Sequence, residues 1–511
     1  MSNNIGQFLD ANVWQFGEYK QLIYLGNGAE QSLTNKQILE HARALATGLR
    51  ASGIKKGDFV ASLLSNIPQI PEIMNGVNRM GGVYMPIVFM LTAAEIRYIL
   101  QDSGCRIIIT EDKLLPKVLE ACASLNTIEL IILIGEESGG GIVHYTELLK
   151  MTDARESVVD VDKDDLAILM YTSGTTGYPK GVMLTHYNMY SQMTAGVAVW
   201  GTDKGESLLT TVPMNNIYGV ISCLEGYLTG FTNILMPPFD PRKVLDTVRK
   251  YRVSVLPVVP TMLNFMLMVW NPAIDDISSL NLLVCSGATL PFDTLSKARD
   301  TFGVEITQGF GCTEAGGSVS RQRLDWPNKP GSSGFPIPGM AVKIVDDDGQ
   351  ELIRGQDGEI LCKGPMLTSG YLNKPKETAD ALKDGWFYTG DMGKIDGDGE
   401  LYVTGRKKDI IIKGGENIDP GIAENCLYQH PAVMECAVIA MKDEKYGEEV
   451  AAVIVLNPGC AVTEEELLLY TSQHIHHFTA PKKIFFMPSL PKTGIGKIKK
   501  KEIRRIIDER H

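Results

Sequence analysis

A run of hydroxyl, glycine and lysine residues follows a short apolar segment about one third of the way along the chain. From Tyr171 to His186 the sequence reads YTSGTTGYPKGVMLTH. Glycines let backbone N–H groups approach an anion, hydroxyls donate further hydrogen bonds, and a lysine adds a positive charge. The segment is not a Walker A loop, because proline precedes the lysine and glycine follows it. It nevertheless predicts a cradle for a polyphosphate, built from Thr172, Ser173, Gly174, Thr175, Thr176, Gly177 and Lys180.

Further segments downstream could complete a nucleotide site. The chain carries CSGA ending at Ala288, GFGCTE ending at Glu314, YTGD ending at Asp391, and GRKKD ending at Asp409. A carboxylate oxygen is a hard ligand that suits a cation bridging phosphates. Each segment alone has a plainer interpretation, such as a tight turn, a helix cap or a solvated surface charge. Two more glycine-rich segments lie near the C-terminal end, GGENI from residue 414 and LPKTGIGK ending at Lys497.

Taken in order, these segments closely resemble the motifs of the adenylate-forming superfamily. That superfamily includes acyl- and aryl-CoA ligases, adenylation domains of peptide synthetases and beetle luciferase. The resemblance covers residues 30–505 and carries implied roles with it. Lys180 and the hydroxyls of 172–176 would contact the β- and γ-phosphates, Glu314 would bind Mg²⁺, and Thr313 and Lys497 would act at the α-phosphate. Nucleotide contacts are implied for Gly287, Ala288, Gly309 and Phe310, ribose contacts for Asp391 and Arg406, a hinge at Lys408, and a pantetheine tunnel at Gly414 and Gly415.

The resemblance implies an acyl-CoA ligase that uses ATP, Mg²⁺ and coenzyme A. Such an enzyme forms an acyl-adenylate from a carboxylic acid, releases pyrophosphate, and then transfers the acyl group to CoA. The main alternative is an acyl-AMP ligase or stand-alone adenylation enzyme that loads the phosphopantetheine of a carrier protein. A non-catalytic relative is a weaker alternative, because the charged residues of the phosphate and ribose segments and the hinge lysine are all present. Luciferase-type oxidation is a further alternative.

One segment departs from the pattern of the superfamily. Many relatives have Pro-x-Phe-His-x-x-Gly where this chain has Pro213-Met-Asn215-Asn216-Ile-Tyr-Gly219. Asparagine is compact and cannot stack, so an aryl or long-chain specificity does not transfer simply. We expect the acid to lie near Asn215, Asn216, Gly287, Ala315 and Gly316, with the small residues 315–317 leaving room beside the nucleotide.

The elements that must position these residues can be read from the hydrophobic pattern. Apolar runs rich in Val, Ile and Leu are typical of buried parallel strands. They lie at 59–64, 107–110, 128–134, 166–171, 253–259 and 282–286, with helical patterns between them such as 35–52. The N-terminal region therefore predicts an α/β fold with βαβ connections.

The residue pattern changes near residue 330, where Asp-Gly turns recur. Between them, segments of alternating apolar and polar residues, such as 341–345 and 359–363, indicate hairpins. We expect a large N-terminal domain, 1–407, of helix-flanked sheets with a β-rich subdomain at about 330–407. A small, mobile α+β C-terminal domain, 408–511, would follow, with the active site between the two domains.

Composition limits the partners. The 511 residues are 44% hydrophobic and 22% charged, with a formal net charge of −12, which argues against nucleic acid. The nine cysteines lie at least ten residues apart, so they lack zinc-ligand spacing and predict reduced thiols. The first residues lack a signal-peptide pattern, and no apolar stretch reaches the roughly 18 residues of a membrane span. We expect a cytoplasmic protein whose partners are a small carboxylic acid and CoA, with the oligomeric state open.

Overall fold

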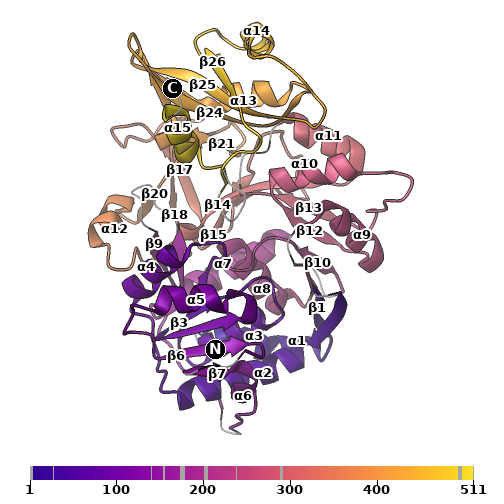
Figure 1. Cartoon of the computed structure of the whole chain (residues 1–511), viewed down its shortest axis with the longest axis vertical. Helices are drawn as coiled ribbons and strands as arrows, with labels where there is room; N and C mark the ends of the chain where they lie inside the picture. The colour runs from indigo at the N-terminus through magenta and orange to yellow at the C-terminus, as the bar shows by residue number, and fades with distance from the viewer. Residues whose placement is uncertain are drawn as a thin grey trace.

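The computed structural model describes residues 4–26, 28–137, 139, 141–153, 156–172, 179–200, 205–237, 239–287, 290, 292–492 and 498–509. Its helices and strands form two large sheets, a smaller sheet beside them and a C-terminal sheet (Figure 1). This is the α/β architecture expected from the sequence, with a β-rich part between the large sheets and the C-terminal unit.

The first large sheet contains the predicted parallel strands at 59–64, 107–110, 128–134 and 166–171, whereas those at 253–259 and 282–286 belong to the second. Among its described strands, only the last, β9, runs antiparallel to its neighbour. In spatial order the strands are β7 (Ile142–His144), β6 (Leu130–Ile134), β5 (Ile107–Glu111), β3 (Phe59–Leu63), β4 (Val83–Ile87), β8 (Leu166–Thr172) and β9 (Lys180–Thr185).

The second large sheet combines the first two strands of the chain with strands that lie between residues 207 and 336. Its order is β16 (Phe335–Pro336), β15 (Gly317–Arg321), β14 (Ile306–Cys312), β13 (Leu282–Cys285), β12 (Val255–Val258), β10 (Ser207–Thr210), β11 (Thr232–Leu235), β1 (Lys20–Gly26) and β2 (Ala29–Thr34). Strand β1 pairs in parallel with β11, so that Leu22 lies opposite Asn233.

Helices lie between and outside the two large sheets. Helices α7 (His186–Trp200) and α8 (Ile217–Thr229) pack against each other and against strands of both sheets. Helix α2 (Asn35–Ala51) matches the helical pattern predicted at 35–52. Thr34 and Gln37 form a capping box at its start, and its stripe of Ile38, Ala42, Leu45 and Leu49 is buried. The remaining helices are α1 (Phe8–Phe16), α3 (Gln69–Arg79), α4 (Ala93–Ser103), α5 (Leu115–Cys122), α6 (Tyr145–Leu149), α9 (Pro241–Tyr251), α10 (Pro260–Val269) and α11 (Phe292–Phe302).

A third sheet follows the Asp-Gly turns. It contains β17 (Ala341–Val345), β18 (Gly358–Lys363), β20 (Trp386–Ile395), β19 (Leu382–Lys383) and β21 (Leu401–Arg406), with α12 (Pro375–Ala381) beside it. The hairpin between β17 and β18 pairs Val345 with Glu359, as the alternating pattern predicted. A 3₁₀ turn, η4 (Lys407–Asp409), connects this sheet to the next.

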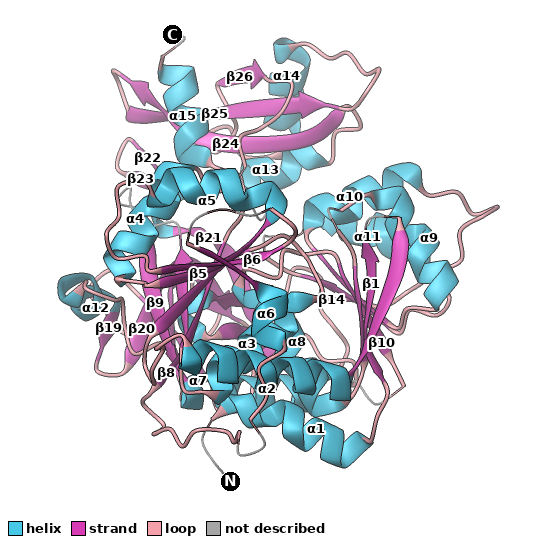
Figure 2. Ribbon diagram, turned by 60° about the horizontal axis from the view of Figure 1, so that its bottom comes forward, coloured by secondary structure: helices cyan, strands magenta, loops and turns pink. Residues whose placement is uncertain are grey.

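The C-terminal sheet has its own hydrophobic core on each face. Its strands are β23 (Glu416–Ile418), β22 (Ile411–Lys413), β25 (Gly447–Leu456), β24 (Val433–Asp443) and β26 (Lys483–Phe486). Alternate residues of β24 point to opposite faces, so Val438 packs toward α13 (Pro420–Tyr428) and α14 (Glu464–His474), whereas Ile439 packs toward α15 (Lys500–Asp508). Figure 2 shows these elements gathered at one end of the molecule.

The N-terminal segment is docked onto the start of α7 by a buried histidine. The backbone N–H of Ile5 donates to Nδ1 of His186 at 3.2 Å, and the His186 side chain is fully buried. Burial lowers the pKa of His186 to about 4, because the charged imidazolium would lose its hydration. The ring is therefore neutral in the folded protein, and Nδ1 can accept only while it stays neutral.

This buried histidine predicts a loss of stability in mild acid. In the unfolded chain the His186 pKa returns to about 6.5, so the unfolded state binds the extra proton as the pH falls from there toward 4. Between pH 7.5 and 5 this single group is expected to lower the free energy of unfolding by about 2 kcal/mol. Urea unfolding of the wild type and of His186→Asn, which keeps an acceptor and does not titrate, would measure it. An equal loss in both proteins would contradict this account.

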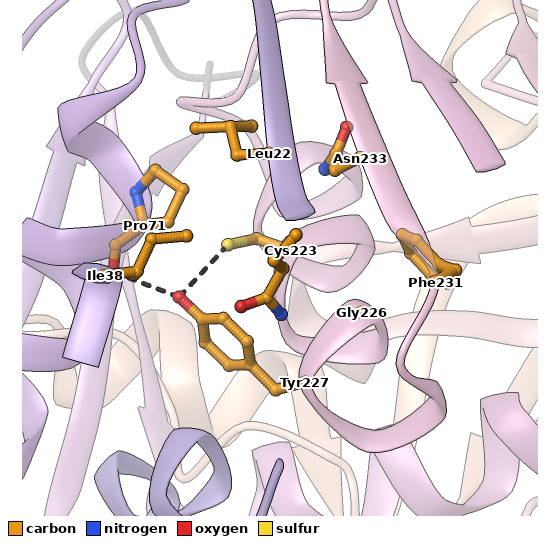
Figure 3. Close-up of a pocket in the computed structure, with 9 residues that line it drawn as sticks. Leu22, Ile38, Pro71, Cys223, Gly226, Tyr227, Phe231 and Asn233 are labelled. Atoms are coloured by element: carbon orange, nitrogen blue, oxygen red, sulfur yellow. Dashed lines mark hydrogen bonds between the residues drawn. The ribbon is translucent and has the colours of Figure 1, made fainter. Parts of the chain in front are cut away.

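A small cavity beneath α8 belongs to the core. It encloses about 10 Å³ and is lined by mostly apolar side chains, among them Leu22, Ile38, Pro71, Cys223 and Phe231 (Figure 3). Inside it the Tyr227 hydroxyl donates to the Pro71 carbonyl at 3.1 Å and accepts from the Cys223 thiol at 3.7 Å. The volume has room for at most one water, so it is not a substrate site.

Candidate active site

The polyphosphate segment begins and ends on paired strands. Thr172 is the last residue of β8, Lys180 is the first of β9, and the two are register partners. The expected contacts Ser173, Gly174, Thr175, Thr176 and Gly177 lie outside the described residues. The strands therefore bring the first hydroxyl and the lysine of the segment to one edge of the first sheet.

A tyrosine links that lysine to the expected metal ligand. The Lys180 ammonium lies over the Tyr371 ring, 4.8 Å from its centroid, and the Tyr371 hydroxyl donates to Glu314 Oε1 at 3.0 Å. Burial is the main cause that raises the pKa of Glu314, and the hydrogen bond from Tyr371 and the charge of Arg406 oppose it. A cation, an aromatic ring and a carboxylate thus form one continuous group.

Tyr371 was not among the residues predicted from the sequence. The segment 368–372 lies against β9: the backbone N–H of Leu372 donates to the Gly181 carbonyl, and the N–H of Met183 donates to the Gly370 carbonyl. The backbone N–H of Thr368 also donates to the Glu314 carbonyl at 2.7 Å. The segment therefore ties β9 to Glu314. Its sequence, TSGYL, is that of an ordinary turn, and its one distinguishing feature is an aromatic residue after glycine.

The expected ribose pair is assembled on neighbouring strands. Asp391 on β20 and Arg406 on β21 are register partners, and Nε of Arg406 lies 3.0 Å from Oδ1 of Asp391. The Asp391 side chain is buried, whereas Arg406 is exposed. Both charges influence the pKa of Glu314, so they lie on the same side of the site as the Lys180–Tyr371–Glu314 group.

The residues present fit a magnesium ion that is held mainly by phosphates. In the part of the chain that the structure describes, no group of three or more His, Cys, Asp or Glu side chains could hold a metal by itself. Magnesium commonly binds through one or two carboxylates together with substrate phosphates. Glu314 offers one desolvated carboxylate, which Tyr371 links to Lys180, and a divalent cation would offset the burial of that charge.

The remaining nucleotide-segment residues lie just after β13, within β14 and just after β14. Gly287 follows β13 with φ +89°, a conformation that favours glycine, and Ala288 lies outside the described residues. At Gly309 on β14 a Cβ would lie 3.0 Å from the Ser320 carbonyl, so the backbones of β14 and β15 approach closely there. Phe310 is half-buried on the same strand, and Thr313 opens the 3₁₀ turn η3 (Thr313–Ala315) that carries Glu314.

The two asparagines that replace the usual Phe-His pair have structural contacts. Asn215 is buried, and its Nδ2 donates to the carbonyls of Leu64 and Ile87 at 3.3 and 3.2 Å, at the ends of β3 and β4. Asn216 caps α8, with Oδ1 accepting from the Gly219 N–H at 2.9 Å. Together they fix how α8 begins relative to the first sheet.

The small residues 315–317 have a packing reason. A Cβ at Gly317 would lie 1.9 Å from Cδ1 of Ile221, and one at Gly316 would lie 3.0 Å from the Met366 carbonyl. The Ala315 methyl is fully buried in a cluster with Met366 and Phe387. Helix α8 and the segment near 366 therefore pack closely against these residues, and the position of the acid beside them stays a prediction.

A charged pair that the sequence analysis missed lies behind β14. Nη2 of Arg321 on β15 lies 3.8 Å from Oε1 of Glu225 on α8, and both side chains are buried. Burial raises the pKa of Glu225 and lowers that of Arg321. The side chain of Arg321 also lies beside Gly309, 3.3 Å from the position of a Cβ there. The region around Gly309 is therefore polar on the side of α8.

The C-terminal candidates are only partly described. Lys497 lies outside the described residues, but Lys492 and Ile498 on either side of it pair in an antiparallel bridge. Lys408 is exposed in η4, between the last strand of the third sheet and the first of the C-terminal sheet. Gly414 and Gly415 form the exposed turn between β22 and β23.

Comparison with known proteins gives the same family along most of the chain. The AMP-binding enzyme model matches residues 9–372, and the model of the AMP-binding enzyme C-terminal domain matches residues 423–497. A feruloyl-CoA synthase of Amycolatopsis sp is 37% identical over 93% of this chain and 94% of its own length. A long-chain-fatty-acid–CoA ligase of Bacillus subtilis is 34% identical, over 94% of this chain and 90% of its own.

Solved structures agree with the sequence comparison. The crystal structure of the anthranilate CoA ligase AuaEII in complex with anthranoyl-AMP superposes with a TM-score of 0.92 at 26% identity, covering 99% of this chain and 97% of that one. None of the described helices is long and apolar enough to cross a bilayer. The chain therefore belongs to the AMP-binding, adenylate-forming family of enzymes, within its acid–CoA ligase group.

Proposed function

We propose that this enzyme converts a carboxylic acid, MgATP and CoA into an acyl-CoA, AMP and pyrophosphate through an acyl-adenylate. The observation that carries the proposal is the Lys180–Tyr371–Glu314 group with the Asp391–Arg406 pair beside it. A positive charge for the phosphates, a carboxylate for a metal cation and a hydrogen-bond acceptor for the ribose hydroxyls occur together there, as an ATP-dependent reaction requires.

In the first step, the acid oxygen attacks the α-phosphorus of ATP and pyrophosphate leaves. Negative charge spreads over the phosphate oxygens in the transition state, so this chain contributes mainly position and positive charge. Lys180 and the hydroxyls of 172–176 hold the β- and γ-phosphates, Thr313 and Lys497 contact the α-phosphate, and Asp391 with Arg406 orients the ribose. Glu314 would hold Mg²⁺, which, when bound, neutralises charge on the phosphates.

In the second step, the CoA thiolate attacks the acyl carbon and AMP leaves. We assign residues 1–407 to the nucleotide- and acyl-binding domain and 408–511 to a C-terminal domain that turns about Lys408. The change of sheet between β21 and β22 supports this division. After the turn, the Gly414–Gly415 loop lines the path of the pantetheine, because glycines leave room for a narrow chain. We place the reaction in the cytoplasm, where ATP and CoA are available.

The pure protein incubated with ATP, Mg²⁺, CoA and a panel of acids tests the proposal. The panel runs from acetate to long-chain, branched, cyclic, aromatic and dicarboxylic acids, and mass spectrometry resolves the products. Acyl-CoA with AMP and pyrophosphate supports the proposal and identifies the acid. Acyl-AMP without thioester would point instead to loading of a carrier protein, and ADP as product would overturn the mechanism.

Loss of the Tyr371 hydroxyl is expected to slow adenylation about 10-fold, the equivalent of one hydrogen bond to a charged group. In Tyr371→Phe the ring still lies under Lys180, but Glu314 loses its donor. Acid-dependent exchange between ATP and labelled pyrophosphate measures the effect.

Tyr171→Phe is the matched control, because the Tyr171 hydroxyl also donates to a carboxylate, Oδ2 of Asp102 at 2.8 Å, away from Glu314. Its exchange rate should stay at the wild-type level. Equal losses in the two variants would mean that Tyr371 acts only through the general stability of the fold.

A further inference from the structure

The exposed turn of the C-terminal sheet is built on a buried lysine. Strands β22 and β23 form a hairpin in which Lys413 is the register partner of Glu416. Gly414 and Gly415, between them, have φ values of +60° and +87°, the pattern of a two-residue turn that requires glycine. A Cβ at Gly415 would meet nothing within 4 Å, so the tip of the turn is open. Lys413 directly before it is only 2% exposed.

The Lys413 ammonium has an anchor on each side. It forms an ion pair with Oε1 of Glu449, which is also buried, and donates to the Phe478 carbonyl at 3.3 Å. It lies 4.6 Å from the centroid of the Phe478 ring and 5.6 Å from that of Tyr446. These two rings contact each other edge to face, with centroids 6.3 Å apart. The side chain is therefore held in one position.

The backbone on each side of Lys413 is hydrogen-bonded to residues at the start of β25. The Ile412 N–H donates to Oε2 of Glu448 at 2.9 Å, and the Gly414 N–H donates to the Tyr446 carbonyl at 2.8 Å. Lys413 itself pairs with Gly447 across the sheet. Ile412, Lys413 and Gly414 are thus each bonded to the segment 446–449, and the Lys413 side chain makes the most buried of these contacts.

Stability alone does not explain a buried lysine at this position. An apolar side chain of similar volume commonly replaces a buried ion pair with no loss of stability, because the desolvation of two charges is avoided. The fixed partners of Lys413 instead hold the residue directly before the Gly414–Gly415 turn in one position.

We propose that Lys413 is a positioning residue for the thioester-forming step, holding the Gly414–Gly415 turn in the shape that admits the pantetheine thiol. The inference rests on the proposed function, since it gives this turn its place in the second half-reaction. Lys413 does not touch the nucleotide group of Lys180, Tyr371 and Glu314, so adenylation does not depend on it.

The test compares both half-reactions in the full-length protein. Lys413→Met is expected to leave acid-dependent pyrophosphate exchange unchanged. Its kcat/KM for CoA, measured with supplied acyl-AMP, should fall at least about 10-fold, as small misplacements of a reacting group do. Lys482→Met, at an exposed lysine of the same domain, should match the wild type in both assays.

A second variant separates orientation from folding. Lys413→Met alone leaves Glu449 buried without its partner, so the double variant Lys413→Met with Glu449→Leu removes both charges and should recover the wild-type Tm. The loss in kcat/KM for CoA should persist in it. Recovery of thioester formation together with Tm, or equal losses in both half-reactions, would overturn the inference.

The proposed function fails separately. If the wild type makes acyl-AMP but no thioester, the acyl-CoA ligase proposal is wrong and the inference falls with it. If the wild type makes thioester and Lys413→Met makes it equally well, only the inference is overturned.

Discussion

Glu314→Gln is expected to reduce acid-dependent pyrophosphate exchange by about 10²- to 10³-fold, the usual cost of removing one electrostatic stabiliser from an active site. Glutamine has nearly the same shape, and its amide oxygen can still accept from the Tyr371 hydroxyl. What it lacks is the charge that would hold Mg²⁺. The exchange rate is measured at saturating ATP while the magnesium concentration is varied.

The same variant should keep or raise the melting temperature. Burial raises the pKa of Glu314, which means that its ionised form is destabilised in the fold, and a neutral amide removes that cost. A loss of activity with no loss of stability would therefore assign Glu314 to the reaction.

Glu72→Gln is the matched control. Glu72 on α3 is another buried carboxylate that accepts from a tyrosine hydroxyl, that of Tyr145 at 2.8 Å, and it also pairs with His41. Its replacement should change stability and leave exchange intact. Full exchange activity in Glu314→Gln would remove Glu314 from the mechanism.

Lys497→Ala should separate the two half-reactions in the opposite sense to Lys413→Met. Adenylation is expected to fall by about 10²- to 10³-fold, because the transition state loses one positive charge near the α-phosphate. Thioester formation from supplied acyl-AMP should be unchanged, because Lys497 is assigned to the first step only, and the proposed turn of the C-terminal domain about Lys408 withdraws it before the thiolate attacks. Pyrophosphate exchange and CoA-dependent release of AMP measure the two steps.

Lys501→Ala provides the control for this variant. Lys501 is an exposed lysine of the same basic tail, on α15. It should match the wild type in both assays, because a solvated charge contributes little. If Lys497→Ala lost both half-reactions equally, the lysine would act through folding or through CoA, and its assignment to the α-phosphate would be wrong.

Local patterns predicted the elements well, because they depend on neighbouring residues. The apolar runs at 59–64, 107–110 and 166–171 are β3, β5 and β8, and the helical stripe at 35–52 is α2. The hairpin of β17 and β18 followed from alternation and an Asp-Gly turn. Strand order could not be predicted in this way, because nothing local to β1 indicates that its partner is β11.

The candidate residues that could be chosen from the sequence are those whose side chain is chemically specific, such as a carboxylate or a guanidinium. The structure places Asp391 beside Arg406, and Glu314 near both. Tyr371 was missed because its contribution depends on a tertiary pairing between 368–372 and β9. The packing of Ile221 against Gly317 could not be predicted either, because a glycine is the same in the sequence whether a substrate or a side chain lies beside it.

The pairing of β1 with β11 has a consequence for synthesis on the ribosome. The β1–β2 hairpin emerges first, yet its sheet partner follows roughly 200 residues later, after the whole first sheet. At about 5–20 residues per second, the edge of β1 stays unpaired for roughly 10–40 s. An exposed apolar edge strand is a template for pairing with other chains. Yield in the cell should therefore depend on chaperones that bind the nascent N-terminus, and slow translation should increase aggregation.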